Sequence, residues 1–207
     1  MALRCTVFAS GGGSNFQALL DRKSAGDLHV DFALVVGNNS TAVAFERARK
    51  AFVPTLHIAP SHFHDETAYV DSLLNALKSA GTELIILAGY MKMLPLKVVQ
   101  EYQNRIVNIH PGLLPAFGGK GMYGMNVHRA VLDYGAKISG ITVHFVDEEY
   151  DHGPIILQEA VPVLSNDTPE ELAARVLKAE HGNFWRAIES IAQGKVVVEG
   201  RRVKVND

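Results

Sequence analysis

Residues 4–20 read RCTVFASGGGSNFQALL, with an apolar run up to Ala9, three glycines at 11–13 and then the polar start of an amphipathic stretch. This order predicts a buried strand over residues 4–9, a glycine loop, and a helix over about 15–24. In open α/β sheets, ligands bind beyond the carboxyl ends of the strands, where such loops lie. The stretch therefore indicates both a fold class and a candidate binding loop.

The same alternation of strand and helix continues along the chain. Further buried strands are expected over residues 30–36, 54–58, 83–88 and 105–109, with helices over 41–51 and 64–79 and a short helix from Pro95. The remaining pattern predicts antiparallel strands over 140–146 and 154–163, a long helix over 168–193, and a hairpin over 196–198 and 203–205. Apolar runs joined by helices are typical of parallel β-α-β units. The predicted fold class is therefore α/β: a single Rossmann-like open sheet, mostly parallel with antiparallel C-terminal strands, and helices on both faces.

Composition narrows the function classes. The 207 residues suit one domain; 47% are hydrophobic and 20% charged, which excludes a disordered chain. A net charge of −2 disfavours nucleic acid as a partner. The single cysteine, Cys5, excludes a disulfide scaffold and is expected in the core, and no apolar run reaches the about 20 residues that span a bilayer. We expect a cytoplasmic protein without nucleic-acid or membrane partners, either a monomer or a homodimer.

The glycine loop is a candidate phosphate site. Gly13, Ser14 and Asn15 can offer backbone and side-chain donors at a helix N-terminus. Phe16 stands where a dinucleotide fingerprint has its third glycine, and no Lys-Ser/Thr pair completes a Walker A loop. A monophosphate is therefore favoured over a dinucleotide, and a simple tight turn is the alternative. A second glycine-rich segment, residues 118–121, could contact a ligand or serve as a flexible connector.

A second candidate site follows the strand predicted over 105–109. Asn108 and His110 are two residues apart, so they share one face of the strand, and Pro111 ends it. An amide beside an imidazole suits acyl-type transfer, because the amide stabilises an oxyanion while the imidazole moves a proton. The carboxylate best placed to orient the imidazole is Asp151, in the acidic loop 147–153, and it would raise the pKa of His110 above about 6.5.

Metal chemistry is not expected, because no H-E-x-x-H or other ligand spacing is present. Most other histidines are expected at the surface or at strand ends: His29, His57, His62, His64 and His152. His144 is interpreted as a satisfied core residue, whereas His128 and His181 have no assigned role.

Five motifs in the same order are characteristic together: GGGSN at 11–15, LAGYMKML at 87–94, NIHPGLLP at 108–115, GITVHFV at 140–146, and DHGPII from Asp151. With them the chain resembles, over essentially its whole length, the phosphoribosylglycinamide formyltransferases, folate-dependent enzymes of purine synthesis. The resemblance implies that 10-formyltetrahydrofolate, as co-substrate, donates its formyl group to the amine of phosphoribosylglycinamide, without a metal. It also implies one formyltransferase domain over 1–207, with a phosphate-binding half at about 1–100 and a folate and catalytic half at about 101–207.

The resemblance also implies roles for single residues. Asn108, His110 and Asp151 would be catalytic, and Gly13, Ser14 and Asn15 would hold the substrate phosphate. The folate pocket would be lined by Met91, Lys92, Met93, Leu94, Asn108 and Val146. Glu180 would lie near the substrate, and Arg105 could steer the folate glutamate tail.

Some of these positions have other interpretations. The apolar members of 91–94 could belong to ordinary core packing, Glu180 to a solvated helix face, and Arg105 could be a structural cation. Glu66 stands where some relatives carry an arginine that reaches the folate, and the segment 118–125 is longer than in the shortest relatives.

Other activities compete with formyl transfer to this amine. Formyltetrahydrofolate deformylases share the catalytic set but add a regulatory domain and tend to carry a second histidine where Pro111 stands. Methionyl-tRNA formyltransferases carry a further C-terminal domain, for which we expect no room here. A dinucleotide-dependent reductase conflicts with Phe16, and a non-catalytic nucleotide-binding module would leave Asn108 and His110 without a purpose.

Overall fold

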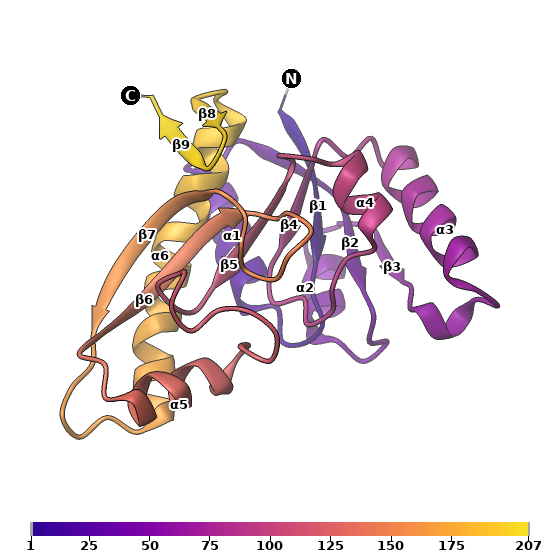
Figure 1. Ribbon diagram of the computed structural model, residues 1–207. Coiled ribbons are helices and arrows are strands. Elements are labelled where there is room, and N and C mark those ends of the chain that lie inside the picture. Colours follow the sequence, from indigo (N-terminus) through magenta and orange to yellow (C-terminus); the bar gives the residue numbers. More distant parts are fainter. Residues whose placement is uncertain (1, 207) are drawn as a thin grey trace. The chain divides into compact units, whose positions relative to one another are not determined.

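The computed structural model describes residues 2–206. The chain divides into two compact units, one up to Val107 and one from Asn108. The first unit contains β1 (Leu3–Phe8), α1 (Ser14–Ala25), β2 (Val30–Gly37), α2 (Val43–Lys50), β3 (Thr55–His57), the 3-10 helix η1 (Pro60–His62), α3 (Glu66–Ser79), β4 (Leu84–Leu87) and α4 (Leu96–Glu101). Strand β5 (Ile106–His110) crosses the boundary. The second unit contains α5 (Met125–Tyr134), β6 (Ile138–Phe145), β7 (Ile155–Pro162), α6 (Pro169–Ala192), β8 (Val196–Glu199) and β9 (Arg202–Val205) (Figure 1).

The strands confirm the predicted α/β class. Seven of them follow the sheet order β3-β2-β1-β4-β5-β6-β7, and β8 and β9 form a separate two-stranded sheet. Strand β1 pairs in parallel with β2 and with β4, β2 pairs in parallel with β3, and β6 pairs antiparallel with β7. The mostly parallel sheet, its antiparallel C-terminal strand and the terminal hairpin are as predicted.

In the first unit, the connections fix where a ligand can bind. The chain moves outward from β1 to β2 and β3, and then returns to place β4 on the other side of β1. Right-handed crossovers then put α1 and α2 on one face of these strands and α3 on the other. The strand order reverses at β1, so the switch point lies beyond the carboxyl ends of β1 and β4. The glycine loop begins there.

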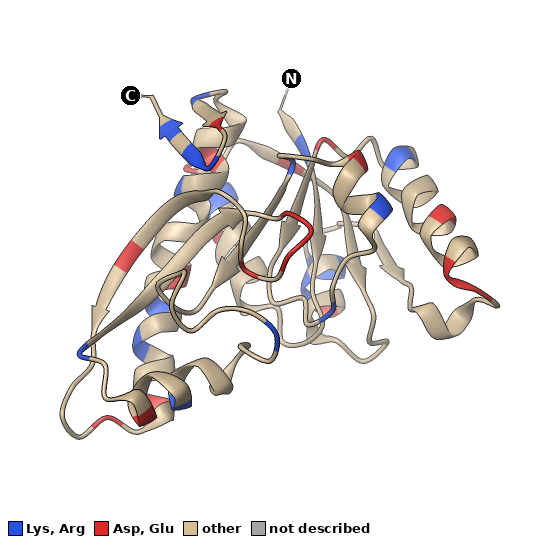
Figure 2. Cartoon of the chain, in the orientation of Figure 1, with Lys and Arg blue, Asp and Glu red and all other residues tan. Residues whose placement is uncertain are grey.

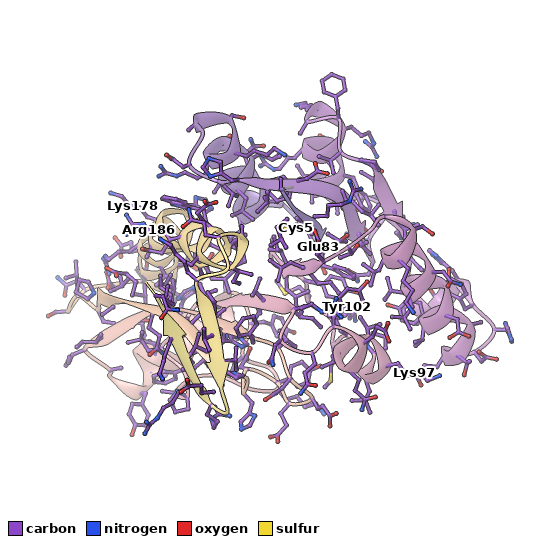
Figure 3. The ribbon with its side chains drawn as sticks, turned by 90° about the horizontal axis from the view of Figure 1, so that it is seen from above. Cys5, Glu83, Lys97, Tyr102, Lys178 and Arg186 are labelled. Atoms are coloured by element: carbon purple, nitrogen blue, oxygen red, sulfur yellow. The ribbon has the colours of Figure 1, made fainter. Side chains whose placement is uncertain are left out.

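Cys5 illustrates how completely the centre of this unit is buried. Its side chain on β1 has no exposed surface, as predicted for a core residue. Burial raises the pKa of its thiol to about 12, and the charges of Glu83 and Asp31 add to this shift. Figure 3 labels Cys5 and Glu83, which lie near each other. At neutral pH the thiol is therefore protonated.

In the second unit, α6 is the main covering element. It contacts β6, β7 and α5 and runs along the two strands (Figure 1). It starts with a capping box, in which the Thr168 side chain accepts from the Glu171 backbone and Glu171 reaches back to the Thr168 N–H. Four apolar side chains of the helix are fully buried: Leu172, Val176, Phe184 and Ile188. Lys178 and Arg186, labelled on the same helix in Figure 3, are exposed.

Helix α5 and the short 3-10 helix η1 were not predicted. The sequence pattern indicated no helix over residues 125–134, where the structure has α5. Gly124 and Gly135 bound this helix, and its buried face consists of Val127, His128 and Val131. A ten-residue helix with so short an apolar face is hard to distinguish from a loop that follows a glycine-rich segment.

Candidate functional site

The glycine loop of the first unit is held against α2. Gly13 has a φ of +66°, and a Cβ on it would lie 2.8 Å from the Cβ of Ala44, so only glycine fits without displacing the helix. The Gly11 carbonyl accepts a hydrogen bond from the Ala44 N–H at 3.1 Å. The Gly12 carbonyl accepts from Nε of Arg47 at 2.8 Å. The loop is thus a fixed structure and more than a tight turn.

The start of α1 is suited to an anion. Its N-cap, Gly13, provides no side-chain cap, and the first turn contains no acidic residue. The first N–H groups of a helix have no partner within the helix, and the helix dipole adds partial positive charge there. Ser14 and Asn15 lie in this turn, where we predicted phosphate-binding residues. These features fit a phosphate.

Arg47 is a residue that the sequence analysis missed. Besides its bond to the loop, its Nη1 donates to Oε1 of Gln17 on α1 at 3.0 Å. The guanidinium therefore joins α2 to the loop and to the first turns of α1, and it adds a positive charge beside the helix N-terminus. Only the packing of α2 on α1 reveals this role, so no local pattern could have indicated it.

Ser10 links the glycine loop to the segment after β4. Its N–H donates to the Gly89 carbonyl at 3.1 Å, and its Oγ accepts from the Met91 N–H at 2.9 Å. The same hydroxyl donates to Oδ1 of Asn38 at 2.6 Å. The structure thus brings the start of the predicted folate-binding segment into contact with the glycine loop, within one unit.

The side chains of the predicted folate segment differ in exposure. Met91 and Met93 are 52% and 48% exposed, and Lys92 is exposed as well. Core packing therefore does not account for these two methionines, whose flexible thioethers suit a flat aromatic ligand. Leu94 is buried and belongs to the core. Val146, in the second unit, is half-buried at the start of the acidic loop.

In the second unit, His110 and Asp151 come together as predicted. The His110 side chain is 3% exposed, and its Nδ1 lies 3.5 Å from Oδ2 of Asp151. On the other side of the ring, Nε2 lies 2.9 Å from the carbonyl of Phe117. Oδ2 of Asp151 also accepts a hydrogen bond from the Gly119 N–H at 2.9 Å.

The contacts of His110 define its protonation. A carbonyl only accepts, so Nε2 carries a proton and Nδ1 of the neutral ring presents its lone pair to Asp151. Burial lowers the pKa of His110, against the opposite effects of Asp151 and the Phe117 carbonyl. The predicted upward shift is therefore wrong in its net direction, because removing the ring from water favours the neutral form more than the carboxylate favours the charged one.

His144 extends this cluster. Its side chain is 2% exposed; Nδ1 donates to the Phe145 carbonyl at 2.7 Å, which leaves Nε2 to accept from Nδ2 of Asn108 at 3.2 Å. Oδ1 of Asp151 lies 3.8 Å from the same Nε2. Burial lowers the pKa of His144, which keeps this accepting form. The predicted satisfied core residue is confirmed, but its partner is Asn108, and that link was missed.

The glycine-rich segment 118–121 is part of this cluster. A Cβ on Gly118 would collide with the Leu114 side chain and lie 3.2 Å from Cβ of Asp151. A Cβ on Gly112 would lie 3.1 Å from Nε2 of His110. Together with the bond from Gly119 to Asp151, these contacts show a packed wall beside both functional groups. The alternative of a flexible connector does not account for them.

Thr142 anchors the loop that follows β5. Its hydroxyl donates to the Gly112 carbonyl at 2.7 Å and accepts from the Leu114 N–H at 3.0 Å. Gln158 on β7 donates to both the Leu114 carbonyl and the Thr142 hydroxyl, at 2.9 and 3.0 Å. This network fixes the chain directly after His110 to β6 and β7.

The acidic loop between β6 and β7 carries Asp151 (Figure 2). Glu148 and Glu149 are exposed, whereas Asp147 is half-buried. Asp151 has a left-handed φ of +52°, and a Cβ on Gly153 would collide with the Phe145 carbonyl oxygen. A turn that ends at Gly153 therefore holds Asp151, and its carboxylate faces His110.

His128 on α5 is a further buried histidine. It is 4% exposed, and its Nδ1 has no hydrogen-bond partner among residues 2–206. Burial lowers its pKa, and the nearby His110 lowers it further. No local pattern could have assigned this residue, because the helix that carries it was not predicted.

Three other residues with predicted ligand contacts differ in burial and in their neighbours. Glu180 is 7% exposed on α6, so the alternative of a solvated helix face is wrong. Arg105 precedes β5, donates to the Glu101 carbonyl and stacks on the Tyr102 ring at 4.8 Å, which describes a structural cation. Glu66 is exposed in the first turn of α3, where a negative charge favours the helix.

The part of the chain that the structure describes contains neither a metal-binding group nor a membrane-crossing helix. Residues 2–206 contain no group of three or more His, Cys, Asp or Glu side chains able to hold a metal ion. Among the same residues, no helix has the length and apolar character needed to cross a membrane.

Comparisons with known proteins agree with this geometry. The formyl transferase family matches over residues 3–188. A chloroplastic phosphoribosylglycinamide formyltransferase of Vigna unguiculata is 42% identical over 194 residues, covering 94% of this chain and 62% of that protein. The phosphoribosylglycinamide formyltransferase of Bacillus subtilis is 40% identical over 185 residues, covering 89% and 92%. The crystal structure of glycinamide ribonucleotide transformylase 1 from Symbiobacterium toebii is 43% identical, has a TM-score of 0.93, and covers 100% of this chain and 95% of that one. The chain spans less than two thirds of the length of the plant relatives it matches.

Proposed function

The chain belongs to the formyl transferase family, and on that premise we propose that it transfers a formyl group from 10-formyltetrahydrofolate to the amine of 5-phosphoribosylglycinamide in purine biosynthesis. The observation that carries this proposal is the cluster of the buried His110 and His144 with the half-buried Asn108 and Asp151. It combines an oriented amide, a neutral imidazole and a carboxylate, which are the groups that acyl-type transfer to an amine requires.

The first unit supplies the binding groups for the phosphate. The glycine loop with Gly13, Ser14 and Asn15 holds the phosphate of the substrate, supported by the uncapped start of α1 and by the charge of Arg47. Met91, Lys92 and Met93 contribute side chains to the folate pocket, where the two exposed methionines are free to contact a pterin, whereas the side chain of Leu94 is buried in the core. We assign no folate contact to Glu66 or Arg105.

The second unit supplies the chemistry. The uncharged amine attacks the formyl carbon, and negative charge develops on the formyl oxygen. Nδ2 of Asn108 donates one N–H to His144, and its second N–H donates to this oxyanion. Nδ1 of His110, which faces Asp151, takes up the proton that the attacking amine loses, and the resulting imidazolium stabilises the oxyanion. The bond between the formyl carbon and the folate nitrogen then breaks, the carbonyl re-forms, and the proton passes to the departing nitrogen. The proposed route includes no metal and no covalent bond to the protein.

Glu180 is the remaining predicted substrate contact. Its carboxylate is buried on α6, a helix that packs on β6 and β7. The resemblance places a carboxylate at this position near the substrate, and the amide or ribose of the substrate offers hydrogen-bond donors to a carboxylate. We therefore retain Glu180 as a substrate-binding residue.

A donor assay tests the proposal. The protein is incubated with 10-formylfolate with and without phosphoribosylglycinamide, and deformylation of the donor is followed. Turnover that requires the amine supports the transferase. Turnover without the amine indicates a formyltetrahydrofolate deformylase, and no turnover in either condition, as expected for a non-catalytic nucleotide-binding module, overturns the proposal.

Substitution of His110 tests whether formyl transfer depends on this cluster of side chains. His110→Ala should lower kcat by about 10²–10⁴-fold, the usual contribution of a proton-transfer group. His64→Ala is the matched control, because this side chain is 81% exposed on another part of the chain. Wild-type turnover in His110→Ala would remove the proposed role of this residue.

We also propose that the 207 residues act as one formyltransferase domain in the cytoplasm, as a monomer or homodimer. The net charge of −2 supports small-molecule substrates in preference to nucleic acid. Sedimentation of the purified protein measures its oligomeric state.

A further inference from the structure

The C-terminal hairpin contacts the acidic loop through one arginine. Arg201 lies in the turn that joins β8 to β9. Its Nη2 donates to the His152 carbonyl at 2.7 Å, and its Nη1 lies 3.0 Å from Nε2 of the same residue. The same Nη1 lies 3.4 Å from Nδ1 of the imidazole, and this Nδ1 lies 2.7 Å from Oδ2 of Asp147. The hairpin and the loop are thus joined through both the backbone and the side chain of His152.

The guanidinium lies against the imidazole, near both of its nitrogens, and not in line with one of them. Its Nη2 donates separately to the His152 carbonyl, which can only accept. The ring is therefore held between Arg201 and the Asp147 carboxylate, while the backbone of His152 is held by Arg201 alone.

These contacts hold the loop at two points around Asp151. Asp147 begins the acidic part of the loop, and its Oδ1 accepts from the Glu149 N–H at 3.0 Å. His152 directly follows Asp151, whose left-handed backbone requires support from its surroundings. Fixing the His152 carbonyl therefore limits the movement of the Asp151 backbone, and with it the carboxylate that faces His110.

The hairpin is itself an ordered element. Its strands pair from Val196 with Val205 to Glu199 with Arg202, and Nζ of Lys204 lies 2.7 Å from Oε2 of Glu199. Strand β9 also contacts β7, which begins just after the acidic loop. The hairpin lies beyond residues 3–188, the part of the chain that matches the family. The support it gives to the loop is therefore a property of this chain that family membership does not assign.

We propose that Arg201 is a positioning residue, which acts through His152 and Asp147 to hold the loop that presents Asp151 to His110. The consequence for catalysis rests on the proposed function, whereas the consequence for the loop does not. Because Arg201 is exposed, its removal should leave the fold intact and loosen only the loop.

Arg201→Ala is the first variant. We expect faster amide hydrogen exchange in residues 147–152 and a kcat lowered by about threefold to tenfold, the effect of losing charge-assisted hydrogen bonds at an exposed position. The KM for the phosphate-bearing substrate should not change, because the glycine loop belongs to the other unit. A variant that merely unfolded in part would change KM and the melting temperature as well.

Arg202→Ala is the matched control, since it removes the same charge from the neighbouring exposed position on β9. In this variant, amide hydrogen exchange in residues 147–152 and kcat should match those of the wild type. Arg201→Lys should lie between the two, because an ammonium cannot donate to the carbonyl and the ring in the same planar arrangement. A double-mutant cycle of Arg201→Ala with His152→Ala should show non-additive effects on kcat.

The experiment distinguishes failure of the Arg201 proposal from failure of the proposed function. If residues 147–152 exchange at the same rate in Arg201→Ala and Arg202→Ala, the proposal is overturned, whatever the activity. If exchange differs but kcat does not, the positioning role is also overturned, because the loop then moves without consequence for Asp151. If the wild type itself is inactive with the formyl donor and the amine, the proposed function fails, while the exchange comparison still decides whether Arg201 holds the loop.

Discussion

At the scale of single residues, the site is a group of side chains whose protons are assigned by their neighbours. His110 is neutral because burial, which lowers its pKa, outweighs Asp151, and His144 is neutral because burial outweighs the Phe145 carbonyl and Asp151, which both raise its pKa. The carboxylate therefore does not hold a permanent imidazolium. The Asp151 carboxylate stabilises a positive charge on His110 only in the step in which His110 takes up a proton. Charge stabilisation in that step lowers the barrier to formyl transfer.

The bond between His144 and Asn108 gives a prediction at this scale. His144→Phe keeps the ring volume but removes the acceptor that orients the Asn108 amide. We expect kcat to fall by about fivefold to tenfold, the worth of one buried hydrogen bond, with little change in KM. Steady-state kinetics with both substrates measure this.

The control for that variant lies on the same strand. Ser139→Ala removes a buried β6 hydroxyl that has no hydrogen-bond partner among the described residues, and kcat should be unchanged. Equal kcat values for His144→Phe and the wild type would show that Asn108 is oriented by something else.

These residues also show what sequence can and cannot reveal. The two-residue spacing of Asn108 and His110, and the glycine-framed turn at Asp151, are local patterns, and the structure has both. The sign of the His110 pKa shift depends on burial, which arises only when the loops after β5 fold over the ring. The pairing of His144 with Asn108 depends on which strands become neighbours, so it had no local signal.

At the scale of elements, the glycine loop depends on α2 for its shape. Arg47 joins α2 to the Gly12 carbonyl and to Gln17 of α1. Arg47→Ala should raise the KM for phosphoribosylglycinamide by about fivefold to twentyfold, because a charge and a hydrogen bond to the loop are lost. The value of kcat should change little, since the proton-transfer groups lie elsewhere.

Arg49→Ala is the control on the same helix, because it leaves the hydrogen bonds of Arg47 to the glycine loop and to α1 in place. Arg49 is exposed and lies two residues further along α2, so its removal changes the net charge equally. If both variants raise KM to the same extent, general electrostatic attraction explains the effect and the specific contact of Arg47 does not.

The start of α6 gives a second element-scale prediction. Thr168→Ala removes the hydroxyl that caps the Glu171 N–H, and it should lower the free energy of unfolding by about 1 kcal/mol. Thr168→Ser keeps the hydroxyl and should remain close to the wild type. Urea unfolding followed by circular dichroism measures both, and equal losses in the two variants would contradict a capping role.

The elements differ in how far local sequence determines them. The capping box and the strands β1, β2 and β4 were predictable, because hydroxyl, proline and glutamate at fixed spacing, or a continuous apolar run, act within a few residues. Helix α5 was not, because its stability comes from packing against α6, with only a short apolar face of its own. Because this helix was not predicted, the burial of His128 was not predicted either.

At the scale of the whole molecule, three buried histidines determine how stability depends on pH. Burial lowers the pKa values of His110, His128 and His144. In the unfolded chain the same residues bind protons near pH 6.5, so below about that pH the unfolded state takes up more protons than the folded one. Their contribution to stability is therefore complete above about pH 6.5 and is lost as the pH falls. The carboxylate of Asp167, whose pKa Arg175 lowers to about 2, acts in a separate and more acidic range.

The free energy of unfolding should then fall by up to about 1.4 kcal/mol per pH unit for each of these histidines as the pH drops from about 6.5 to about 5. Urea titrations at several pH values give this slope. His128→Leu should reduce it, because this ring is buried with one nitrogen unpartnered among residues 2–206, and leucine removes the titrating group while filling the site. His64→Ala, at a side chain that is 81% exposed, is the control for the loss of a histidine outside the buried sites. A wild-type protein as stable at about pH 5 as at about pH 7.5 would show that the buried histidines take up protons in the folded state, and the neutral cluster from which the proposed reaction starts would then be wrong.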